Sequence, residues 1–542
     1  MPEAIRDRSL RWLSRVMFVV AGVAAFSLVA QYGFYLSERE RRLLTMVDLV
    51  IVGVFMVDAV VRFALSRRKG LYLKARWPAL GIVVLIIVQL FLVFVLQGRG
   101  GLPVFMSSPG VFSLAKGYII VLQVYLVLLI LGEAVRANRS IASTRVAPAR
   151  TIIASFVLII IVGALLLATP RATVGGAMAP VDSLFTAASA VCVTGLIVVD
   201  TGSHFTRFGH AIILTLIQIG GLGLITFATF FAAILRGGLG VRESLVLRGM
   251  MTFESIGRIG RTLRYVIGIT FLMEIAGAGL LYLATRSDFG TTAQTVRASV
   301  FHSVSAFCNA GFSLNATSFE RYVSNVPVNL VMTTLIVVGG LGFPVLMSVV
   351  HKYPLIGRGA GAGRRWPLHV RLVLVMTLAL LVLGTVSFLV LEWNGTLADK
   401  PFGAKLVASY FGSVTARTAG FNTVRTASLA LPTLFLLAAL MFVGGSPGGT
   451  AGGVKTVSVG LVLASIRSMF IGTGRVEFFK RRVPDWLVRE ALVVVSMGIL
   501  VVVGGTLVLL VAEDLTLREV LFEVVPAFGT VGLSTGITPS LS

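Results

Sequence analysis

Four segments of the chain share one pattern: FTAASAVCVTGL (185–196), FHSVSAFCNAGF (301–312), YFGSVTARTAGF (410–421) and FEVVPAFGTVGL (522–533). Each begins with an aromatic residue and ends with a glycine and a large apolar residue; the glycines are Gly195, Gly311, Gly420 and Gly532. The stretch before each glycine is roughly half of the ~20 residues that a membrane-spanning helix needs. We therefore expect four short helices that enter a membrane and return as extended segments, in an internal repeat.

Re-entrant segments of this kind suit a cation pore. A short helix that points its C-terminus inward presents partial negative charge there. Beyond it, main-chain carbonyls can replace the water around an ion, as in K⁺-selective filters, and glycine tolerates the backbone angles that this needs. The candidate ion-binding residues are Val193, Thr194, Gly195, Asn309, Ala310, Gly311, Thr418, Ala419, Gly420, Thr530, Val531 and Gly532.

Small residues also permit close helix packing in membranes, which is the alternative interpretation of these glycines. That interpretation suits other glycines of the chain better than four that recur in register behind short helices. The glycines that it suits are Gly220, Gly221 and Gly223, and Gly339, Gly340 and Gly342.

Longer apolar runs flank the four segments. First runs lie near 151–170, 263–285, 370–392 and 487–511, and second runs near 208–236, 327–350 and 431–469. Basic gaps follow the second runs, so each unit is expected to enter and return on the cytoplasmic side. The predicted pore units are 151–262, 263–369, 370–486 and 487–542.

The composition excludes a soluble protein. Charged residues make up only 13% of the 542 residues, apolar residues make up 56%, and the mean hydropathy is +0.94. The fold class is therefore an all-α, multi-pass membrane protein. The net charge of +24 lies in short loops between apolar runs, so it predicts a cytoplasmic N-terminus in the cell membrane and no nucleic-acid partner. No constellation of catalytic residues or metal ligands stands out, so we expect no enzyme.

Residues 1–150 contain four further apolar runs, near 16–36, 45–65, 78–96 and 111–133, and predict a four-helix transmembrane bundle. The stretch 57–77 resembles part of a voltage-sensor domain, and Asp58 and Arg62 could pair at i, i+4. A working sensor needs a helix with repeated arginines, but the run 111–133 contains only Lys116 as a basic residue. We therefore interpret the bundle as degenerate or accessory.

The strings VCVTGLIVVDTG, FCNAGFS, TARTAGFNT and GTVGLSTGIT, together with IQIGGLGLITF (217–227), resemble the Ktr/Trk/HKT superfamily of potassium transporters. The resemblance covers roughly 151–542 and is greatest to KtrB, the membrane subunit of bacterial Ktr systems. It implies four helix–pore loop–helix units around one pore, usually in homodimers. It also implies K⁺ uptake, often by Na⁺-coupled symport, under a cytosolic nucleotide-binding ring of the KtrA or TrkA type. All four filter glycines are present, which in this family accompanies a preference for K⁺.

The stretch FVGGSPGGTAGGVKT (442–456) is too rich in glycine to continue a helix. It resembles the family's intramembrane gate, with Gly444, Gly445, Gly448, Gly449, Thr450, Gly452, Gly453 and Lys455 as its residues. One alternative is a simple flexible kink. Another is a phosphate-binding loop, but Val454 separates the glycines from the lysine where that motif needs Gly-Lys.

Several other residues carry structural expectations. Arg417 is interpreted as a buttress behind the pore rather than an ion-controlling residue, with Glu523 or Asp182 as its candidate partner. Cys192 and Cys308 are expected to be small buried residues, and Glu274 an interior hydrogen-bond partner.

The sequence ends at Ser542, ten residues after Gly532. The resemblance implies a fourth inner helix with a basic residue beyond this point, so we expect a truncated sequence. Two other functions stay open: a Na⁺-permeable or Na⁺/K⁺-coupled transporter, and a non-conducting membrane scaffold or regulatory subunit. Transported K⁺, and possibly Na⁺, is the only ion expected, with no covalent cofactor.

Overall fold

The computed structural model describes residues 3–65, 69, 148–238, 259–352, 366–472, 475–479 and 481–541. The chain divides into two compact units. The first comprises Met1–Ala147 and Thr169–Arg171, and the second comprises Pro148–Ala168 and Ala172–Ser542. The predicted apolar runs 78–96 and 111–133 lie outside the described residues.

In the first unit, the described helices are α1 (Glu3–Gly33) and α2 (Glu38–Leu65). The first apolar run, near 16–36, forms the second part of α1, which begins at Glu3. The basic stretch before it continues the helix, because arginine is a good helix former and can extend beyond the apolar part. The two helices share a buried polar cluster, in which Ser27 Oγ and Gln31 Nε2 donate to the carboxylate of Asp48 at 2.7 and 2.6 Å.

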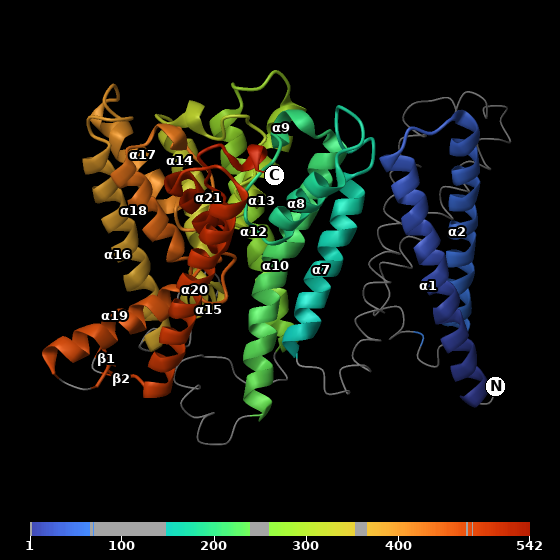
Figure 1. The fold of residues 1–542 in the computed structure, drawn as a ribbon. Coiled ribbons are helices and arrows are strands. Elements are labelled where there is room, and N and C mark those ends of the chain that lie inside the picture. The colour runs from blue at the N-terminus through green and yellow to red at the C-terminus, as the bar shows by residue number, and fades with distance from the viewer. Residues whose placement is uncertain are drawn as a thin grey trace. The chain divides into compact units, whose positions relative to one another are not determined.

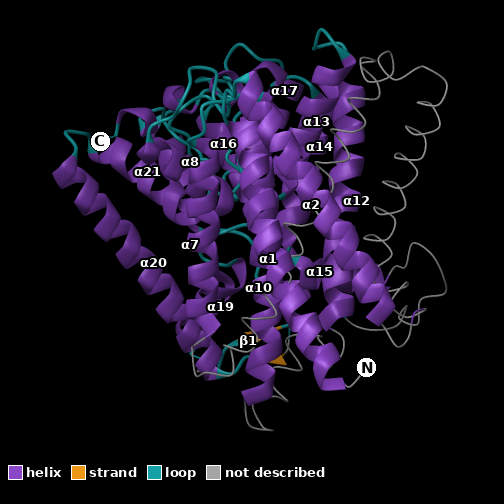
Figure 2. Ribbon diagram, turned by 90° about the vertical axis from the view of Figure 1, so that its right-hand side faces the viewer, coloured by secondary structure: helices purple, strands orange, loops and turns teal. Residues whose placement is uncertain are grey.

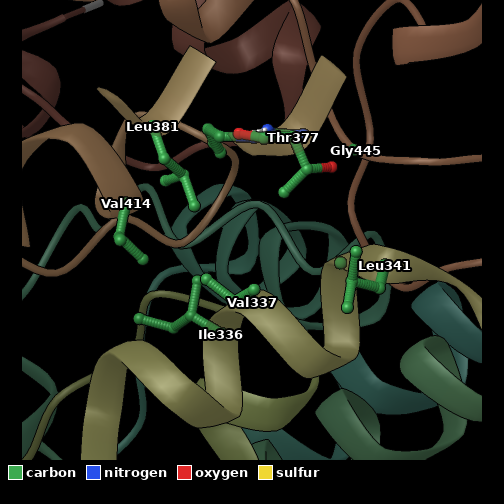
Figure 3. A pocket seen from close by; sticks show the side chains of 9 residues that line it. Ile336, Val337, Leu341, Thr377, Leu381, Val414 and Gly445 are labelled. Atoms are coloured by element: carbon green, nitrogen blue, oxygen red, sulfur yellow. Dashed lines mark hydrogen bonds between the residues drawn. The ribbon is translucent and has the colours of Figure 1, made fainter. Parts of the chain in front are cut away.

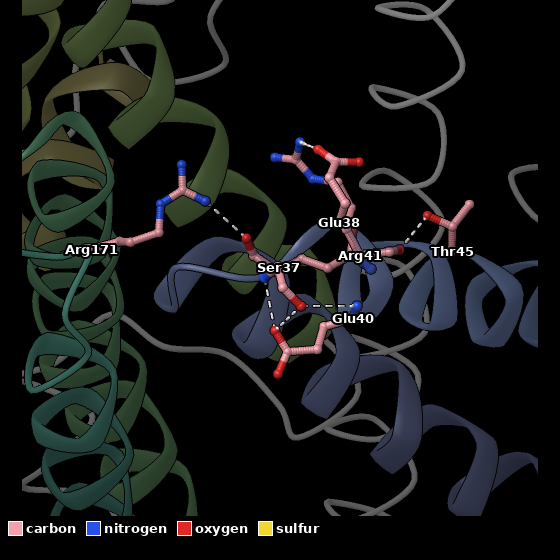
Figure 4. A network of polar contacts seen from close by, with 7 residues as sticks. Ser37, Glu38, Glu40, Arg41, Thr45 and Arg171 are labelled. Atoms are coloured by element: carbon pink, nitrogen blue, oxygen red, sulfur yellow. Dashed lines mark hydrogen bonds and ion pairs between the residues drawn. The ribbon is translucent and has the colours of Figure 1, made fainter.

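The turn between these helices is held by a polar network (Figure 4). Ser37 caps α2: its amide and hydroxyl donate to Glu40 Oε2 at 2.8 and 2.7 Å, and the Glu40 amide donates to Ser37 Oγ at 3.4 Å. This reciprocal arrangement satisfies amide groups that the helix start would otherwise leave free. Further along α2, Arg62 Nε donates to both carboxylate oxygens of Asp58 at 2.8 and 2.9 Å, so the predicted i, i+4 pair is present.

In the residues that the structure describes, the regular elements of the second unit are helices and one two-stranded hairpin (Figures 1 and 2). A long helix, a short helix, an extended segment and a further helix follow each other repeatedly along the chain. The elements are α7 (Pro148–Leu167), α8 (Pro180–Val191), α9 (Thr201–His204), α10 (Arg207–Gly238), α12 (Ile259–Thr285), α13 (Thr292–Phe307), η2 (Glu320–Tyr322), α14 (Val326–Leu341), α15 (Phe343–Lys352), α16 (Leu368–Leu391), α17 (Phe402–Thr415), η3 (Thr426–Ser428), α18 (Leu431–Phe442), α19 (Thr456–Ile471), β1 (Glu477–Phe478), β2 (Arg481–Arg482), α20 (Asp485–Ala512), α21 (Leu517–Gly529) and η4 (Thr538–Ser540).

The short helices α8, α13, α17 and α21 start at local signals in the sequence. Pro180 is the first residue of α8, where its missing amide costs nothing. Thr291 caps α13 by accepting from the Gln294 amide. Thr516 caps α21 in a capping box with Glu519, in which hydroxyl, carboxylate and amides are mutually bonded. These starts set the length of each short helix and hence where its C-terminus lies.

Several described helices are long and apolar enough to cross a membrane. They are Glu38–Phe63, Arg264–Thr285, Leu368–Leu391 and Asp485–Ala512, and the bent pair Val326–Leu341 and Phe343–Val350 adds a fifth if it counts as one span. Their outward faces expose large apolar side chains, with Val511 of α20 89% exposed. Such surfaces fit a hydrocarbon surround and not water.

Candidate functional site

The four predicted glycines meet in the second unit. Each one lies against the carbonyl oxygen of the residue that precedes the next glycine, so the contacts close a ring in one rotational sense. A Cβ atom added to a glycine would approach this oxygen to 2.5 Å (Gly195 to Ala310), 3.1 Å (Gly311 to Ala419), 2.4 Å (Gly420 to Val531) and 2.3 Å (Gly532 to Thr194). Four segments that lie far apart in the sequence therefore converge on one point at a spacing that only glycine allows.

We call residues 193–195, 309–311, 418–420 and 530–532 the glycine segments. They share one backbone conformation, in which both the first residue and the glycine have positive φ. The values are 57° and 85° (Val193, Gly195), 58° and 73° (Asn309, Gly311), 70° and 76° (Thr418, Gly420), and 51° and 81° (Thr530, Gly532). The non-glycine positions are costly, by about 1–2 kcal/mol each, so packing around the segments must hold them in place.

The short helices position the glycine segments. Each helix ends directly before its segment, and the middle residue of each segment donates its amide back to a carbonyl near the helix end. These bonds are Thr194 to Ser189 (2.8 Å), Ala310 to Ser305 (2.7 Å), Ala419 to Thr415 (3.0 Å) and Val531 to Pro526 (2.8 Å). The amides of the middle residues are thus hydrogen-bonded to the preceding helices. The C-terminal, partially negative ends of these four helices face the segments.

Hydroxyl groups hold the residue after the glycine in three of the four cases. Ser189 Oγ donates to the Leu196 carbonyl at 2.7 Å, and Ser305 Oγ donates to the Phe312 carbonyl at 2.8 Å. Thr415 Oγ1 makes the corresponding bond to the Phe421 carbonyl at 2.5 Å. The fourth helix carries Pro526 at the position aligned with Ser189 and Ser305 and lacks this bond.

The carbonyl oxygens of the glycine segments accept no hydrogen bond within the described part of the chain. Among the residues that the structure describes, none donates a hydrogen bond to a carbonyl of residues 193–195, 309–311, 418–420 or 530–532. Val193, Ala310, Ala419 and Val531 are nevertheless at most 1% exposed. Buried carbonyls normally have a partner, and a cluster without one requires water or an ion. A ring of such oxygens offers the ligands that a dehydrated alkali cation needs.

A loop of residues 443–455 separates α18 from α19, and we call it the crossing loop. Val443 and Val454 form an isolated parallel bridge at its base. Its Ser446 and Thr450 amides donate to the carbonyls of Gly340 and Gly339 on α14, at 3.0 and 3.3 Å. The predicted interruption of this helix is therefore present as an ordered loop against α14.

The crossing loop also contacts the end of α13 and the first residue of the fourth glycine segment. Thr450 Oγ1 donates to the Phe307 carbonyl at the end of α13, at 3.3 Å. A Cβ atom added to Gly452 would lie 2.1 Å from Thr530 Oγ1. Lys455 is half-buried, and its Nζ donates to the Ala451 carbonyl at 2.6 Å. The lysine is thus bound within the loop itself.

A bend in α14 was not predicted. Gly342, with φ of 84°, separates α14 from α15, which turns by 100°. The Phe343 amide then donates to the Gly448 carbonyl of the crossing loop at 2.9 Å. Gly342 therefore ends α14 at the bend, because positive φ cannot continue a helix, and it also packs closely, since an added Cβ would lie 2.7 Å from the Pro447 carbonyl. Gly220 and Gly339 do serve packing: an added Cβ would lie 2.1 and 2.0 Å from the Val191 and Phe307 carbonyls.

Arg417 links the third short helix to the crossing loop. Its side chain is 7% exposed, and it donates to the carbonyls of Thr377 and Gly444, at 3.3 Å each. The predicted acidic partner is wrong: Glu523 is bound to the residues that follow Gly532, and Asp182 lies in the first turn of α8. Carbonyl groups can solvate the guanidinium without a second buried charge.

A small cavity lies beside Arg417, between α14, α16, α17 and the crossing loop (Figure 3). Its lining includes Val337, Thr377, Leu381 and Gly445. About 10 Å³ is open to the centre of a water molecule, about the space of one water. Thr377 Oγ1 is buried without a hydrogen-bond partner in the described structure. The wall of this cavity therefore contains the Arg417 guanidinium, which is a hydrogen-bond donor, and an unused hydroxyl group.

Glu274, Cys192 and Cys308 lie outside the glycine segments. Glu274 is 4% exposed and lies 3.9 Å from the Cys308 sulfur, while its carbonyl accepts from Ser303 Oγ at 2.7 Å, so its predicted interior role is present. Cys308 is buried as predicted, but Cys192 is only half-buried. In the described part of the chain, no group of three His, Cys, Asp or Glu residues could hold a metal ion.

The fold and the site define a helical membrane protein in which four glycine segments of one chain converge on a common point. The family of TrkH cation transport proteins matches residues 120–542. The chain therefore belongs to the TrkH cation transport family, which confirms the predicted superfamily and a transport protein rather than an enzyme.

Individual proteins agree with this assignment. The chain is 36% identical over 407 residues to Ktr system potassium uptake protein B of Bacillus subtilis, covering 75% of this chain and 89% of that protein. It is 35% identical over 404 residues to potassium/sodium uptake protein NtpJ of Enterococcus hirae, covering 73% and 88%. The crystal structure of the potassium transporter TrkH from Vibrio parahaemolyticus matches with a TM-score of 0.57 at 17% identity, covering 84% of this chain and 96% of that chain.

Proposed function

We propose that this protein takes up K⁺ across the cell membrane through a pore in which the glycine segments are the selectivity filter. The observation that carries the proposal is the ring of buried carbonyl oxygens with no donor within the described protein. Four short helices direct their C-terminal dipoles at this ring, so it favours a cation and disfavours an anion. Carbonyls bind an alkali cation without proton chemistry, so no cofactor is needed, and K⁺ is the cargo.

Potassium is preferred over sodium in this proposal because each of the four segments carries a glycine. A side chain at any of these positions would crowd a neighbouring carbonyl and so change the size and symmetry of the ion's cage. The Bacillus subtilis relative is a potassium uptake protein by name, and the Enterococcus hirae relative is a potassium/sodium uptake protein by name. Na⁺ coupling by symport is therefore part of the proposal that the transport assay must decide.

We further propose that the crossing loop is the gate. It lies against the end of α13 and next to Thr530, directly beside two of the four supports of the filter. It is anchored mostly by single main-chain hydrogen bonds to α14, each of which contributes only about 1 kcal/mol. Such a loop can leave its place at modest cost.

The finer assignments rest on the family resemblance and on charge. We propose a homodimer in the plasma membrane, with the N-terminus in the cytoplasm and a cytosolic nucleotide-binding ring of the KtrA or TrkA type as regulator. The basic residues of β2 and of the start of α20, Arg481, Arg482 and Arg489, support this orientation, because basic loops stay in the cytoplasm.

Growth of a bacterium that lacks its own K⁺ uptake systems tests the proposal. Expression of the full chain should restore growth at low external K⁺, and uptake of ⁸⁶Rb⁺ should follow the same dependence. Sensitivity to Na⁺ without rescue would favour a sodium-permeable transporter. A protein that reaches the membrane and conducts neither ion would favour the non-conducting scaffold and overturn the proposal.

A further inference from the structure

Two of the four short helices carry a polar side chain that binds the segment beyond the glycine. The residues are His302 on α13 and Glu523 on α21. Both occupy the second position of the aligned twelve-residue strings, where the other two helices carry Thr186 and Phe411. Neither residue has a role in the site described so far.

His302 binds the segment that follows Gly311. Its Nε2 accepts from the Leu314 amide at 3.1 Å and lies 3.1 Å from Ser313 Oγ. Because the Leu314 amide donates to Nε2, the neutral ring carries its proton on Nδ1 and uses Nε2 as the acceptor. The ring is 5% exposed and packs edge-on against Phe319, with 5.0 Å between ring centroids.

Glu523 makes the corresponding contacts after Gly532. Its Oε1 accepts from the Ser534 hydroxyl and, at 3.2 Å, from the Thr535 amide. Its Oε2 accepts from Thr538 Oγ1 at 2.7 Å. Glu523 is 3% exposed. The three partners named here, Ser534, Thr535 and Thr538, all lie in the one segment that follows Gly532.

The two arrangements match residue by residue. In each, the serine two positions after the glycine and the amide three positions after it face the same acceptor. In each, that serine also accepts from the amide two residues further on, from Asn315 at 3.1 Å and from Gly536 at 2.8 Å. An imidazole and a carboxylate thus do the same task on two unlike sequences, which points to a requirement for an acceptor at this place.

We call His302 and Glu523, each with the segment that it binds, the two clamps. They belong to the glycine segments of Gly311 and Gly532, which lie on opposite sides of the ring. Gly311 and Gly532 each contact Gly195 or its neighbour on one side and Gly420 or its neighbour on the other. The first helix has Thr186, whose Oγ1 is buried without a partner, and the third has Phe411. At the first corner the Gly195 amide donates to Ser189 Oγ at 3.1 Å, and at the third the Asn422 amide donates to Ser318 Oγ at 3.3 Å. In the described structure, an acceptor at the second position of the short helix, bound to the amide three residues after the glycine, is therefore found at the two opposite corners of Gly311 and Gly532.

We propose that His302 and Glu523 are positioning residues that fix the carbonyl directions at opposite corners of the filter and thereby set its K⁺ over Na⁺ selectivity. This inference rests on the proposed function. Neither side chain touches the ion. Each holds an amide three residues beyond a filter glycine, and losing the acceptor removes the hydrogen bond that fixes the orientation of that segment.

The first measurement does not depend on transport. Hydrogen–deuterium exchange of the full chain in detergent reports on residues 312–317, 533–538 and, as a reference, 196–200. His302→Phe keeps a flat ring against Phe319 but removes the acceptor, and should speed exchange at 312–317 about tenfold, the effect of one net hydrogen bond. Glu523→Met should do the same at 533–538. The reference segment should not change in either variant.

The second measurement is the competition between Na⁺ and ⁸⁶Rb⁺ uptake in liposomes that contain each variant. His302→Phe and Glu523→Met should lower the ratio of Rb⁺ to Na⁺ uptake several-fold. His302→Gln and Glu523→Gln, which each retain an acceptor oxygen, should restore the ratio and the slow exchange. Thr186→Val is the matched control at the equivalent position and should leave both unchanged.

The outcomes are separable. Unchanged exchange in His302→Phe and Glu523→Met overturns the clamps. Faster exchange with an unaltered uptake ratio reduces both residues to structural supports and overturns their role in selectivity. A wild-type chain that transports no K⁺ instead refutes the proposed function, and with it the selectivity role, even if exchange reveals the clamps.

Discussion

The residues that define the site most sharply are not the glycines alone but the non-glycine residues two positions before them. Val193 is β-branched and has φ of 57°, a conformation that such a residue adopts only under constraint. Asn309, Thr418 and Thr530 repeat this conformation with three unrelated side chains. The geometry is therefore imposed by the helix end and the ring, and not by the preference of any one residue.

At this scale we predict that Gly311→Ser weakens selectivity while the protein still folds. Among the four glycines, Gly311 has the most room: an added Cβ would lie 3.1 Å from the nearest atom, compared with 2.3–2.5 Å at the other three. Serine there must still hold positive φ and displace a carbonyl slightly. The ratio of K⁺ to Na⁺ flux should fall by about tenfold, equivalent to ~1.4 kcal/mol.

The space around each glycine also predicts how severe a serine substitution is at Gly420 and Gly532. Gly420→Ser and Gly532→Ser should abolish uptake, because the added Cβ would overlap a main-chain oxygen that cannot move away. Gly279→Ser on α12 is the control, since a Cβ there meets nothing within 4 Å. Equal selectivity of Gly311→Ser and wild type in flux assays would contradict the carbonyl filter.

At the scale of elements, the bend after α14 and the crossing loop form one structure. The Phe343 amide binds the Gly448 carbonyl, and the Thr450 amide binds the Gly339 carbonyl on the other side of the bend. Arg417 adds a bond from the third short helix to Gly444. A displacement of the loop therefore has to break its contacts with α14, with the end of α13 and with Arg417 together.

We predict that removing Gly448, Gly449 and Thr450 raises K⁺ flux. The deletion takes away the loop's bonds to Phe343, Gly339 and Phe307, so the closed position loses most of its anchoring. Initial rates of ⁸⁶Rb⁺ uptake into liposomes measure the effect, with the amount of folded protein checked by size-exclusion chromatography. A rate equal to that of wild type, from an intact protein, would remove the gating role.

At the scale of the whole molecule, the sequence predicted the class of fold, the apolar helices of the second unit and the stretch of chain that holds the site. The aligned strings succeed because glycine at a fixed register is a strong local signal. Sequence reasoning missed the 100° bend at Gly342, because a glycine that packs and a glycine that bends look alike before φ is known. It also missed the partners of Arg417, because main-chain carbonyls leave no trace in the side-chain sequence.

The clamps could have been found in part from the sequence. His302 and Glu523 are polar residues at one aligned position, the second, of the twelve-residue strings. The amides that donate to them belong to Leu314 and Thr535. Whether these amides reach the two side chains depends on how the chain turns after each glycine. That turn is set by contacts between units far apart in the chain, which no local pattern contains.

We predict that deletion of residues 1–147 leaves ion selectivity unchanged. The compact second unit contains all four glycine segments and the crossing loop, and the match to the Bacillus subtilis relative covers 75% of this chain. The shortened and complete proteins should give the same ratio of K⁺ to Na⁺ flux, whatever the change in yield. A shifted ratio would assign the first unit a direct influence on the filter.

The contact that closes the ring joins Gly195 to Gly532, and this has a consequence for biogenesis. The ribosome makes the residues between them (532 − 195 = 337) in roughly 20–70 s, at about 5–20 residues per second. In the last part of that interval, while the final 112 residues are made (532 − 420 = 112), three corners have been synthesised and the fourth has not, so the ring lacks one of its four segments. A nascent chain stalled before the last corner thus presents a distinctive polar gap in the bilayer, and this gap is a feature by which membrane proteases can distinguish it from the finished protein.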